Sequence, residues 1–385
     1  MEDVDSYGNT PLIVAAKSGE YEDVETWLRR GASIEATGED GYTALIMASW
    51  EGHVRVVDLL LEKGANTEAA NVNGYTALME AARNNHVDVV ERLLLNGANF
   101  EAIGTDGHSA LIVAASSGAV GTVKALVEGG ANIDATDANG NTALTCAVAS
   151  DETWFSHTTI DFLLRNGIQT EAVNMKGRTA LLEGAAQGKE RAVRALLLGG
   201  ANIEAADREG STALSLAAFY GKNKVVATLL REGASIVAIN IDGFTALGSA
   251  TIGGKDEIVS MLLERGADTE VANRCGVTSL IAAALYNRDT VVDVLLTGGA
   301  DIEARHNNGS TSVIVAATYG RNSALHSLIR GGANLEAVDN DGNRAIMLAH
   351  RNGHRDAVRM LIEAGAILEA DVDYGAYIVT VTATN

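Results

Sequence analysis

A glycine recurs at a fixed interval along almost the whole chain, and this period limits the fold more than any other feature. The spacing is 33 residues at every step except the one from Gly140 to Gly177, where it is 37. The recurring glycines are Gly8, Gly41, Gly74, Gly107, Gly140, Gly177, Gly210, Gly243, Gly276, Gly309, Gly342 and Gly375. Such a period predicts a solenoid in which each unit packs on its neighbours, so we expect one array rather than several globular domains.

Each unit has the pattern of two short helices followed by a loop, and residues 41–73 illustrate it. Thr43 is placed to cap a first helix over about residues 44–51, and residues 54–63 form a second helix with a broad apolar stripe. Ser or Thr occupies the cap position in ten of the eleven units, with Arg344 as the exception. The second helix ends at a glycine in all eleven, as expected for a left-handed terminal residue. The sequence therefore predicts an all-α fold.

The unit resembles the ankyrin repeat. The residues that carry the resemblance in this copy are Gly41, Thr43, Leu45, Ala48, Gly52, His53, Leu59, Leu60, Gly64 and Ala65. One departure is systematic: the histidine that follows the family's leucine is replaced in every copy, for example by Ile46. The resemblance implies a solenoid of paired antiparallel helices with projecting finger loops. It covers eleven repeats over residues 1–373, and residues 374–385 are a partial repeat or a C-terminal tail.

Three places depart from the regular array. Repeat five carries four extra residues near residues 151–157, between its helices, and they include Trp154 and Phe155. These rings either form an extra contact site or fold back over the neighbouring repeats. In repeat eight, Gly248 and its neighbours predict a helix of low intrinsic stability. The tail either covers the last repeat, or the chain is a piece of a longer protein.

Composition excludes several classes of function. The formal net charge of −21 disfavours duplex nucleic acid and anionic membrane surfaces, which attract Lys and Arg. No apolar run is long enough to span a bilayer, and the acidic start lacks the order of a secretory signal. Two distant cysteines do not form a disulfide framework. We therefore expect an intracellular protein, in the cytoplasm or alternatively the nucleus, with no membrane insertion.

Aromatic residues gather at the positions where the resemblance places a concave binding surface. Five variable positions in each of eleven repeats make 55 sites, and these hold nine of the 17 aromatic residues. Tyr and Trp dominate interface hot spots, so we predict two partner-binding groups. The first group is Tyr7, Tyr42, Trp50 and Tyr75, and the second, with its apolar neighbours, is Phe219, Tyr220, Phe244, Ile252, Leu285, Tyr286 and Tyr319. The alternative is that the rings pack against one another along the stack.

An acidic residue also recurs once per repeat, before each finger. The series is Glu35, Glu68, Glu101, Asp134, Glu171, Glu204, Glu270, Glu303, Glu336 and Glu369, with Val237 as the one replacement. We call it the acidic ladder. Its carboxylates either accept hydrogen bonds from backbone amides of the fingers, which would depress their pKa values, or form a stripe for a cation or a basic partner. The first interpretation predicts that stability falls on acidification.

No motif indicates catalysis or a cofactor. The stretch 248–256 lacks the Ser or Thr of a phosphate-binding loop, and His350 and His354 have no evident third metal ligand. We therefore predict a non-catalytic scaffold or adaptor, acting as a monomer, that binds a protein or peptide on its concave face. The alternative is the ankyrin-like targeting region of a larger enzyme, such as a kinase or ubiquitin ligase, whose catalytic part lies outside this chain.

Overall fold

The computed structural model describes residues 4–6, 8–150 and 154–368, and for residues 154–156 it describes the backbone alone. In these ranges helices alternate with loops, and the β structure consists of isolated antiparallel bridges within fingers, such as that between Ala70 and Thr76. The predicted all-α fold is thus confirmed. No helix in the described part of the chain is long and apolar enough to cross a membrane.

Each repeat contributes a first and a second helix. The first helices are α1 (Pro11–Ser18), α3 (Ala44–Glu51), α5 (Ala77–Arg83), α7 (Ala110–Ser116), α9 (Ala143–Ala149), α11 (Ala180–Gln187), α13 (Ala213–Phe219), α15 (Ala246–Gly253), α17 (Ser279–Leu285), α19 (Ser312–Thr318) and α21 (Ala345–Arg351). The second helices are α2 (Tyr21–Arg29), α4 (Val54–Glu62), α6 (Val87–Leu95), α8 (Val120–Glu128), α10 (Trp154–Arg165), α12 (Glu190–Leu198), α14 (Asn223–Arg231), α16 (Asp256–Glu264), α18 (Asp289–Thr297), α20 (Asn322–Arg330) and α22 (Arg355–Glu363).

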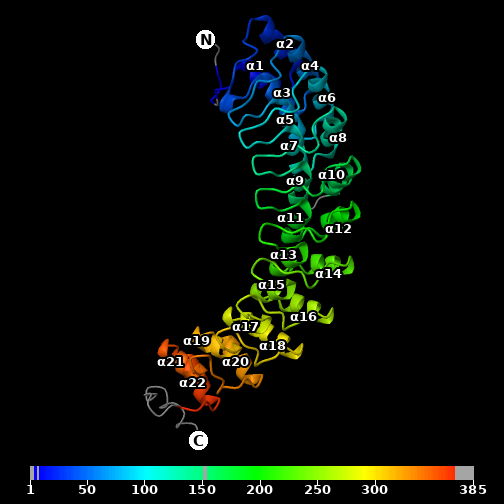
Figure 1. Cartoon of the computed structure of the whole chain (residues 1–385). Helices are drawn as coiled ribbons and strands as arrows, with labels where there is room; N and C mark the ends of the chain where they lie inside the picture. The colour runs from blue at the N-terminus through cyan, green and yellow to red at the C-terminus, as the bar shows by residue number, and fades with distance from the viewer. Residues whose placement is uncertain (1–3, 7, 151–153, 369–385) are drawn as a thin grey trace. The chain divides into compact units, whose positions relative to one another are not determined.

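The chain forms two compact units, residues 1–184 with 191–202, and residues 185–190 with 203–385. Inside each unit, first helices pack on first helices, as α1 does on α3 and α13 on α15, and second helices pack on second helices, as α2 does on α4 and α16 on α18. Figure 1 shows these two helical layers within each unit, with the fingers on the side of the first helices. The predicted pairing of helices and fingers is therefore present in both units.

The helix boundaries follow from the repeated residues. The Thr43 hydroxyl accepts a hydrogen bond from the Ile46 N–H at 3.3 Å and so caps α3. At the other end of the repeat, Gly64 has a φ of +84°, which a Cβ would disfavour. Ile46, which stands where the family has histidine, is fully buried with Leu60 of the second helix. An apolar residue there enlarges the core that stacking buries.

The irregular repeats five and eight differ from the others in helix length and helix contact. The helix α10 has 12 residues, whereas the other second helices have nine. Trp154 and Phe155 lie in the first turn of α10. Residues 151–153 are outside the described part of the chain. In α15, a Cβ at Gly248 would lie 2.8 Å from the Phe244 ring, and one at Gly253 would overlap the Phe219 carbonyl. The absence of side chains at these glycines lets α15 approach its neighbours closely.

The acidic ladder links successive repeats through hydrogen bonds. Nine of its carboxylates accept a backbone N–H at 2.7–3.0 Å; Glu369 lies outside the described residues. The pairs are Glu35–Asn66, Glu68–Asn99, Glu101–Asn132, Asp134–Gln169, Glu171–Asn202, Glu204–Ser235, Glu270–Asp301, Glu303–Asn334 and Glu336–Ile367. The amide interpretation is confirmed, but the donors lie after the second helix of the next repeat and not in a finger.

Removing one carboxylate of the ladder should weaken a contact between two repeats. We expect Glu303→Ala to lower the free energy of unfolding by about 1–2 kcal/mol, because the Asn334 amide loses a charged acceptor. Glu303→Gln keeps an acceptor oxygen and should cost less. Val237→Ala, at the ladder position without a carboxylate, is the control and should change little. Urea denaturation measures all three, and equal midpoints for Glu303→Ala and wild type would contradict the role of the ladder.

Candidate partner-binding site

The second predicted group lies along consecutive repeats of one unit. Phe219 ends α13 and Tyr220 follows it, Leu285 ends α17 and Tyr286 follows it, and Tyr319 follows α19. The same register in stacked repeats places these residues in a row. We call the row, with Phe244 and Ile252, the C-terminal aromatic surface.

Four of its rings are accessible to solvent. The exposed fractions are 41% for Phe219, 45% for Tyr220, 47% for Tyr286 and 54% for Tyr319. Phe219 and Tyr220 meet edge to face with their centroids 5.1 Å apart, a favourable aromatic geometry. This contact fixes the two rings while leaving much of each uncovered.

A cavity of about 340 Å³ lies at one end of this surface, in repeats nine to eleven. Leu285 and Tyr319 line it together with the apolar residues Val277, Ile281, Val315 and Leu348. Polar residues from the fingers and from α21 complete its lining, namely His306, Asn308, Ser310, Asp339, Asp341, Asn343 and Arg351, with Thr318 from α19. A cavity lined by both apolar and polar groups can take an apolar side chain and orient it.

The polar lining is held in place by its own hydrogen bonds. Asp339 accepts the Asn343 N–H at 2.8 Å and the Asp341 N–H at 3.0 Å. Burial tends to raise the pKa of Asp339, but the hydrogen bonds from Asn343 and Asp341 and the charge of Arg351 lower it below its ordinary value. Asp339 is therefore ionised at neutral pH, and it fixes the finger that borders the cavity.

The first predicted group is less accessible. Tyr7 lies outside the described residues. Trp50 is 37% exposed, and its ring centroid is 5.2 Å from that of the half-buried Tyr42. Tyr75 is only 6% exposed, and its hydroxyl donates to Asp106. Burial, followed by this hydrogen bond, raises the pKa of Tyr75 to about 12.

The burial of Tyr75 has a local cause in the next finger. A Cβ at Gly104 would overlap the Tyr75 ring, so the ring occupies the space that this glycine leaves. The Arg83 guanidinium covers the ring from 4.6 Å. The sequence contains a signal for the burial of Tyr75, namely Gly104. The equivalent position in most other fingers holds Asp or Asn, which would leave no space for the ring. Tyr75 therefore packs between repeats and offers little surface to a partner.

A buried carboxylate lies beneath the first group. Glu80 is fully buried in α5 and accepts hydrogen bonds from Tyr42 at 3.4 Å and Asn71 at 3.2 Å, while Arg83 lies 3.5 Å from its other oxygen. Burial raises the pKa of Glu80, and the Arg83 charge opposes this shift. The equivalent residue in repeat ten is Val315, in the cavity. The same position of the repeat is therefore acidic beneath the first aromatic group, as Glu80, and apolar beside the C-terminal aromatic surface, as Val315.

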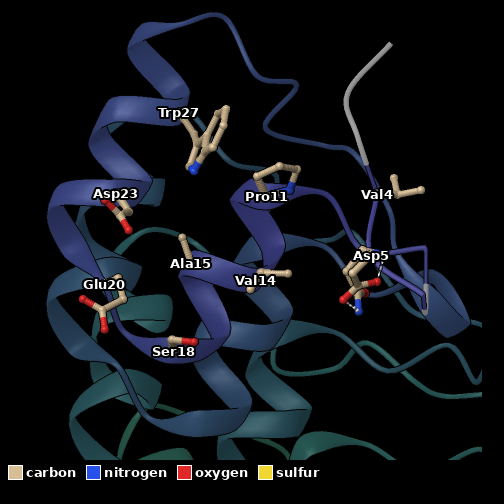
Figure 2. Close-up of a pocket in the computed structure, with 10 residues that line it drawn as sticks. Val4, Asp5, Pro11, Val14, Ala15, Ser18, Glu20, Asp23 and Trp27 are labelled. Atoms are coloured by element: carbon tan, nitrogen blue, oxygen red, sulfur yellow. Dashed lines mark hydrogen bonds between the residues drawn. The ribbon is translucent and has the colours of Figure 1, made fainter.

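A second cavity, of about 480 Å³, opens on the outer side of repeat one (Figure 2). Figure 2 shows Pro11, Val14 and Trp27 around it, with the acidic Asp23 at its edge. Val14 is 41% exposed, whereas its equivalent Met47 in repeat two is 7% exposed because the first repeat packs on it. This cavity is therefore the uncovered end face of the stack rather than a part of either aromatic group.

The described residues contain no group of three or more His, Cys, Asp or Glu side chains arranged to hold a metal ion. The cysteines are free, and burial, together with the charge of Asp137, raises the pKa of the Cys146 thiol to about 12. A thiol with so high a pKa is a poor nucleophile at neutral pH.

Comparison with known proteins agrees with this architecture. A family model described as ankyrin repeats, in three copies, matches residues 12–103, 92–174, 153–240, 229–306 and 280–373. The human ASB11 ankyrin repeat domain is similar in structure, with 25% identity, a TM-score of 0.53, and coverage of 59% of this chain and 99% of that one. The ankyrin repeat domain of Bcl-3, described as a unique member of the IkappaB protein family, gives 29% identity, a TM-score of 0.50, and coverage of 58% and 99%. No curated protein sequence matches the chain.

Proposed function

Because the chain belongs to the ankyrin repeat family, whose members generally serve as protein–protein interaction modules, we propose that it is a non-catalytic scaffold or adaptor inside the cell. Its partner is a protein or peptide that binds the C-terminal aromatic surface, with an apolar side chain in the adjoining cavity. In the first group Trp50 is 37% exposed, whereas Tyr75 is buried and adds little to such a surface.

One observation supports this proposal above the others. Four aromatic rings, each 41–54% exposed, lie on repeats seven, nine and ten of one unit, and one of them, Tyr319, lines a cavity. Aromatic rings provide large contact areas with few rotatable bonds, so their burial by a partner costs little conformational entropy. Single exposed apolar residues are normal on a protein surface, whereas several of them in a row indicate a surface that a partner covers.

The test removes two of these rings without touching the core. We expect Tyr286→Ala with Tyr319→Ala to reduce capture of the partner at least tenfold, because interface aromatic anchors each contribute about 2 kcal/mol or more. The thermal unfolding midpoint should stay the same, since both rings are about half exposed. Affinity capture from cell extract followed by quantitative mass spectrometry compares the variant with wild type.

A matched control uses apolar residues that are at least as exposed but lie elsewhere. Leu95 ends α6 and Leu198 ends α12, with exposed fractions of 80% and 87%. Leu95→Ala with Leu198→Ala should capture the same proteins as wild type. The proposal fails if the tyrosine variant retains every partner, or if the leucine variant loses the same ones.

A further inference from the structure

A row of basic residues borders the C-terminal aromatic surface at the turns between first and second helices. It occupies the position twelve residues after the recurring glycine in repeats seven to ten of one unit. The residues are Lys222, Lys255, Arg288 and Arg321, and we call them the cation row. Their side chains are all partly buried. In repeats one to four the same position holds Glu20, His53, His86 and Ala119. The run of cations therefore accompanies the aromatic surface.

Contacts place the cation row next to the exposed rings. The stem of Lys255 lies across Gly221, the residue that follows Tyr220 in the chain. A Cβ on that glycine would lie 2.9 Å from the Lys255 Cδ. In repeat ten, the central guanidinium carbon of Arg321 lies 6.0 Å from the centroid of the Tyr319 ring. The cation row therefore runs along one edge of the aromatic surface.

The hydrogen bond made at this position does not require a permanent charge. The Arg288 guanidinium donates to the Ile252 carbonyl, near the end of the preceding first helix, at 3.1 and 3.2 Å. A histidine ring nitrogen makes the equivalent contact in three other repeats, at 2.8–3.0 Å, in the pairs His53–Lys17, His86–Trp50 and His354–Thr318. A neutral imidazole can donate such a bond. Four consecutive Lys or Arg residues are therefore not explained by contact with the helix.

The cation row has no opposite charge of its own. None of its four side chains forms an ion pair with a carboxylate of the described residues, although the chain has 50 acidic and 29 basic residues. Asp256 and Asp289 follow it in the first turns of α16 and α18 without pairing with it. Glu209 and Asp242 lie in fingers, at the other end of the first helices, about 10 Å away. That distance exceeds the Debye length of about 8 Å at physiological salt.

We propose that the cation row binds an extended acidic segment of the partner, whose apolar side chains cover the rings of the aromatic surface. This inference rests on the proposed function and names the chemistry of its partner. Packed helices lie about 8–10 Å apart, and successive charges of the row are spaced alike. In a segment of polyproline II form, every third residue points to the same side, about 9 Å further along. Carboxylates three residues apart therefore match the row.

The charges favour an acidic protein segment over a nucleic acid. A nucleic acid strand carries a phosphate on every nucleotide, so its phosphates outnumber the cations, which the row offers at one per repeat. The excess of phosphates would meet a chain of net charge −21. An acidic segment with one carboxylate per repeat brings only the charges that the row neutralises. Its apolar side chains also bury the rings, which a purely acidic partner would leave exposed.

A synthetic peptide tests the chemistry of this partner. The probe is a fluorescein-labelled peptide of about twelve residues, with Glu at every third position and Leu or Phe between. Fluorescence anisotropy at about pH 8 and 0.15 M salt should show binding to the whole chain with a Kd of about 100 µM or lower. The same peptide with Gln in place of Glu should bind at least tenfold more weakly, because it lacks the charges that the row attracts.

A variant of the row uses the histidine found at the same position in other repeats. Lys222→His, Lys255→His, Arg288→His and Arg321→His together keep a ring nitrogen for the helix carbonyl and remove the charge at about pH 8. This variant should bind the peptide at least tenfold more weakly than wild type. At about pH 5.5 the imidazoles are protonated while the Glu side chains of the peptide stay largely ionised. Binding should then return to within about threefold of wild type at that pH.

A matched control removes four exposed cations that lie outside the row. Lys63→His, Lys124→His, Arg231→His and Arg265→His change the net charge by the same amount and should bind the peptide within about twofold of wild type at about pH 8. Circular dichroism checks that both fourfold variants fold. Equal binding of the row variant and wild type, equal binding of the Gln and Glu peptides, or no binding to wild type at about 1 mM would overturn the proposal. So would tighter, row-dependent binding of oligouridylate, which would assign the row to nucleic acid.

Capture from cell extract separates this inference from the proposed function. The row variant should lose the partners that Tyr286→Ala with Tyr319→Ala loses. If the tyrosine variant loses them and the row variant keeps them, the acidic segment is wrong while the proposed function stands. If the tyrosine variant keeps every partner, the proposed function itself fails.

Discussion

Gly107→Ala should lower the free energy of unfolding by about 3–4 kcal/mol. A Cβ at this position would lie 2.5 Å from the backbone nitrogen of Ala138 in the next finger, and backbone cannot turn aside as a side chain does. Overpacking of this kind costs about 1–3 kcal/mol. The φ of +78° adds about 1–2 kcal/mol for a residue with a Cβ. Urea denaturation of the whole chain measures the loss.

The control separates the contact from the backbone strain. Gly97 has a φ of +84°, and a Cβ there meets nothing within 4 Å. Gly97→Ala should therefore show the conformational cost alone, about 1–2 kcal/mol. Hydrogen exchange should show extra opening around the fingers of repeats four and five in Gly107→Ala but not in Gly97→Ala. Equal destabilisation by the two substitutions would mean that finger contact contributes nothing.

Arg83→Ala is expected to cost about 2–3 kcal/mol at pH 7, somewhat less than for a fully buried ion pair, because Arg83 is partly exposed. The substitution leaves the Glu80 carboxylate buried with two neutral hydrogen-bond donors. Glu80→Gln keeps the shape and removes the charge, so it should be neutral or stabilising. The double variant should recover most of the loss, which a purely steric role for Arg83 would not allow.

The pH dependence has a definite sign. Burial raises the pKa of Glu80 in the folded chain above its ordinary value of 4.5. At a pH between the ordinary pKa and the folded-state pKa, the folded chain therefore binds the proton more readily than the unfolded chain. The contribution of Glu80 to stability therefore increases as pH falls through the folded pKa. The loss of unfolding free energy in Arg83→Ala relative to wild type should become smaller over the same range. Urea denaturation midpoints of both proteins from pH 7 to pH 5 measure this loss. A deficit that grows on acidification would contradict this account.

The sequence predicts the helices and turns of the repeat well, because each recurring residue has the same local environment in every copy. Thr43 caps its helix and Gly64 adopts the left-handed backbone, as their spacing indicates. Of the two interpretations of the acidic ladder, the one in which its carboxylates accept amide hydrogen bonds agrees with the structure, but it places the donors in the fingers. The Asn66 amide that binds Glu35 lies 31 residues further on, and stacking alone brings the two together.

The binding surface could be predicted less completely, since exposure depends on neighbouring repeats. Tyr75 and Tyr286 both occupy variable positions, yet Tyr75 enters the space beside Gly104 while Tyr286 stays 47% exposed. Likewise Val315 and Leu348 have the ordinary pattern of core residues. They line a cavity because three neighbouring repeats surround it. The sequence of a single repeat does not contain this information.

The bond between Asp134 and the Gln169 amide spans 35 residues where the other bonds of the ladder span 31, yet its length is 2.9 Å. The four extra residues of repeat five are thus accommodated between its helices, where α10 begins earlier, and the contact to the next repeat is unchanged. The stack therefore tolerates changes of length at this place. New segments can be acquired or grafted between the helices of a repeat while its neighbours keep their register, a route by which an array of this kind diversifies without refolding.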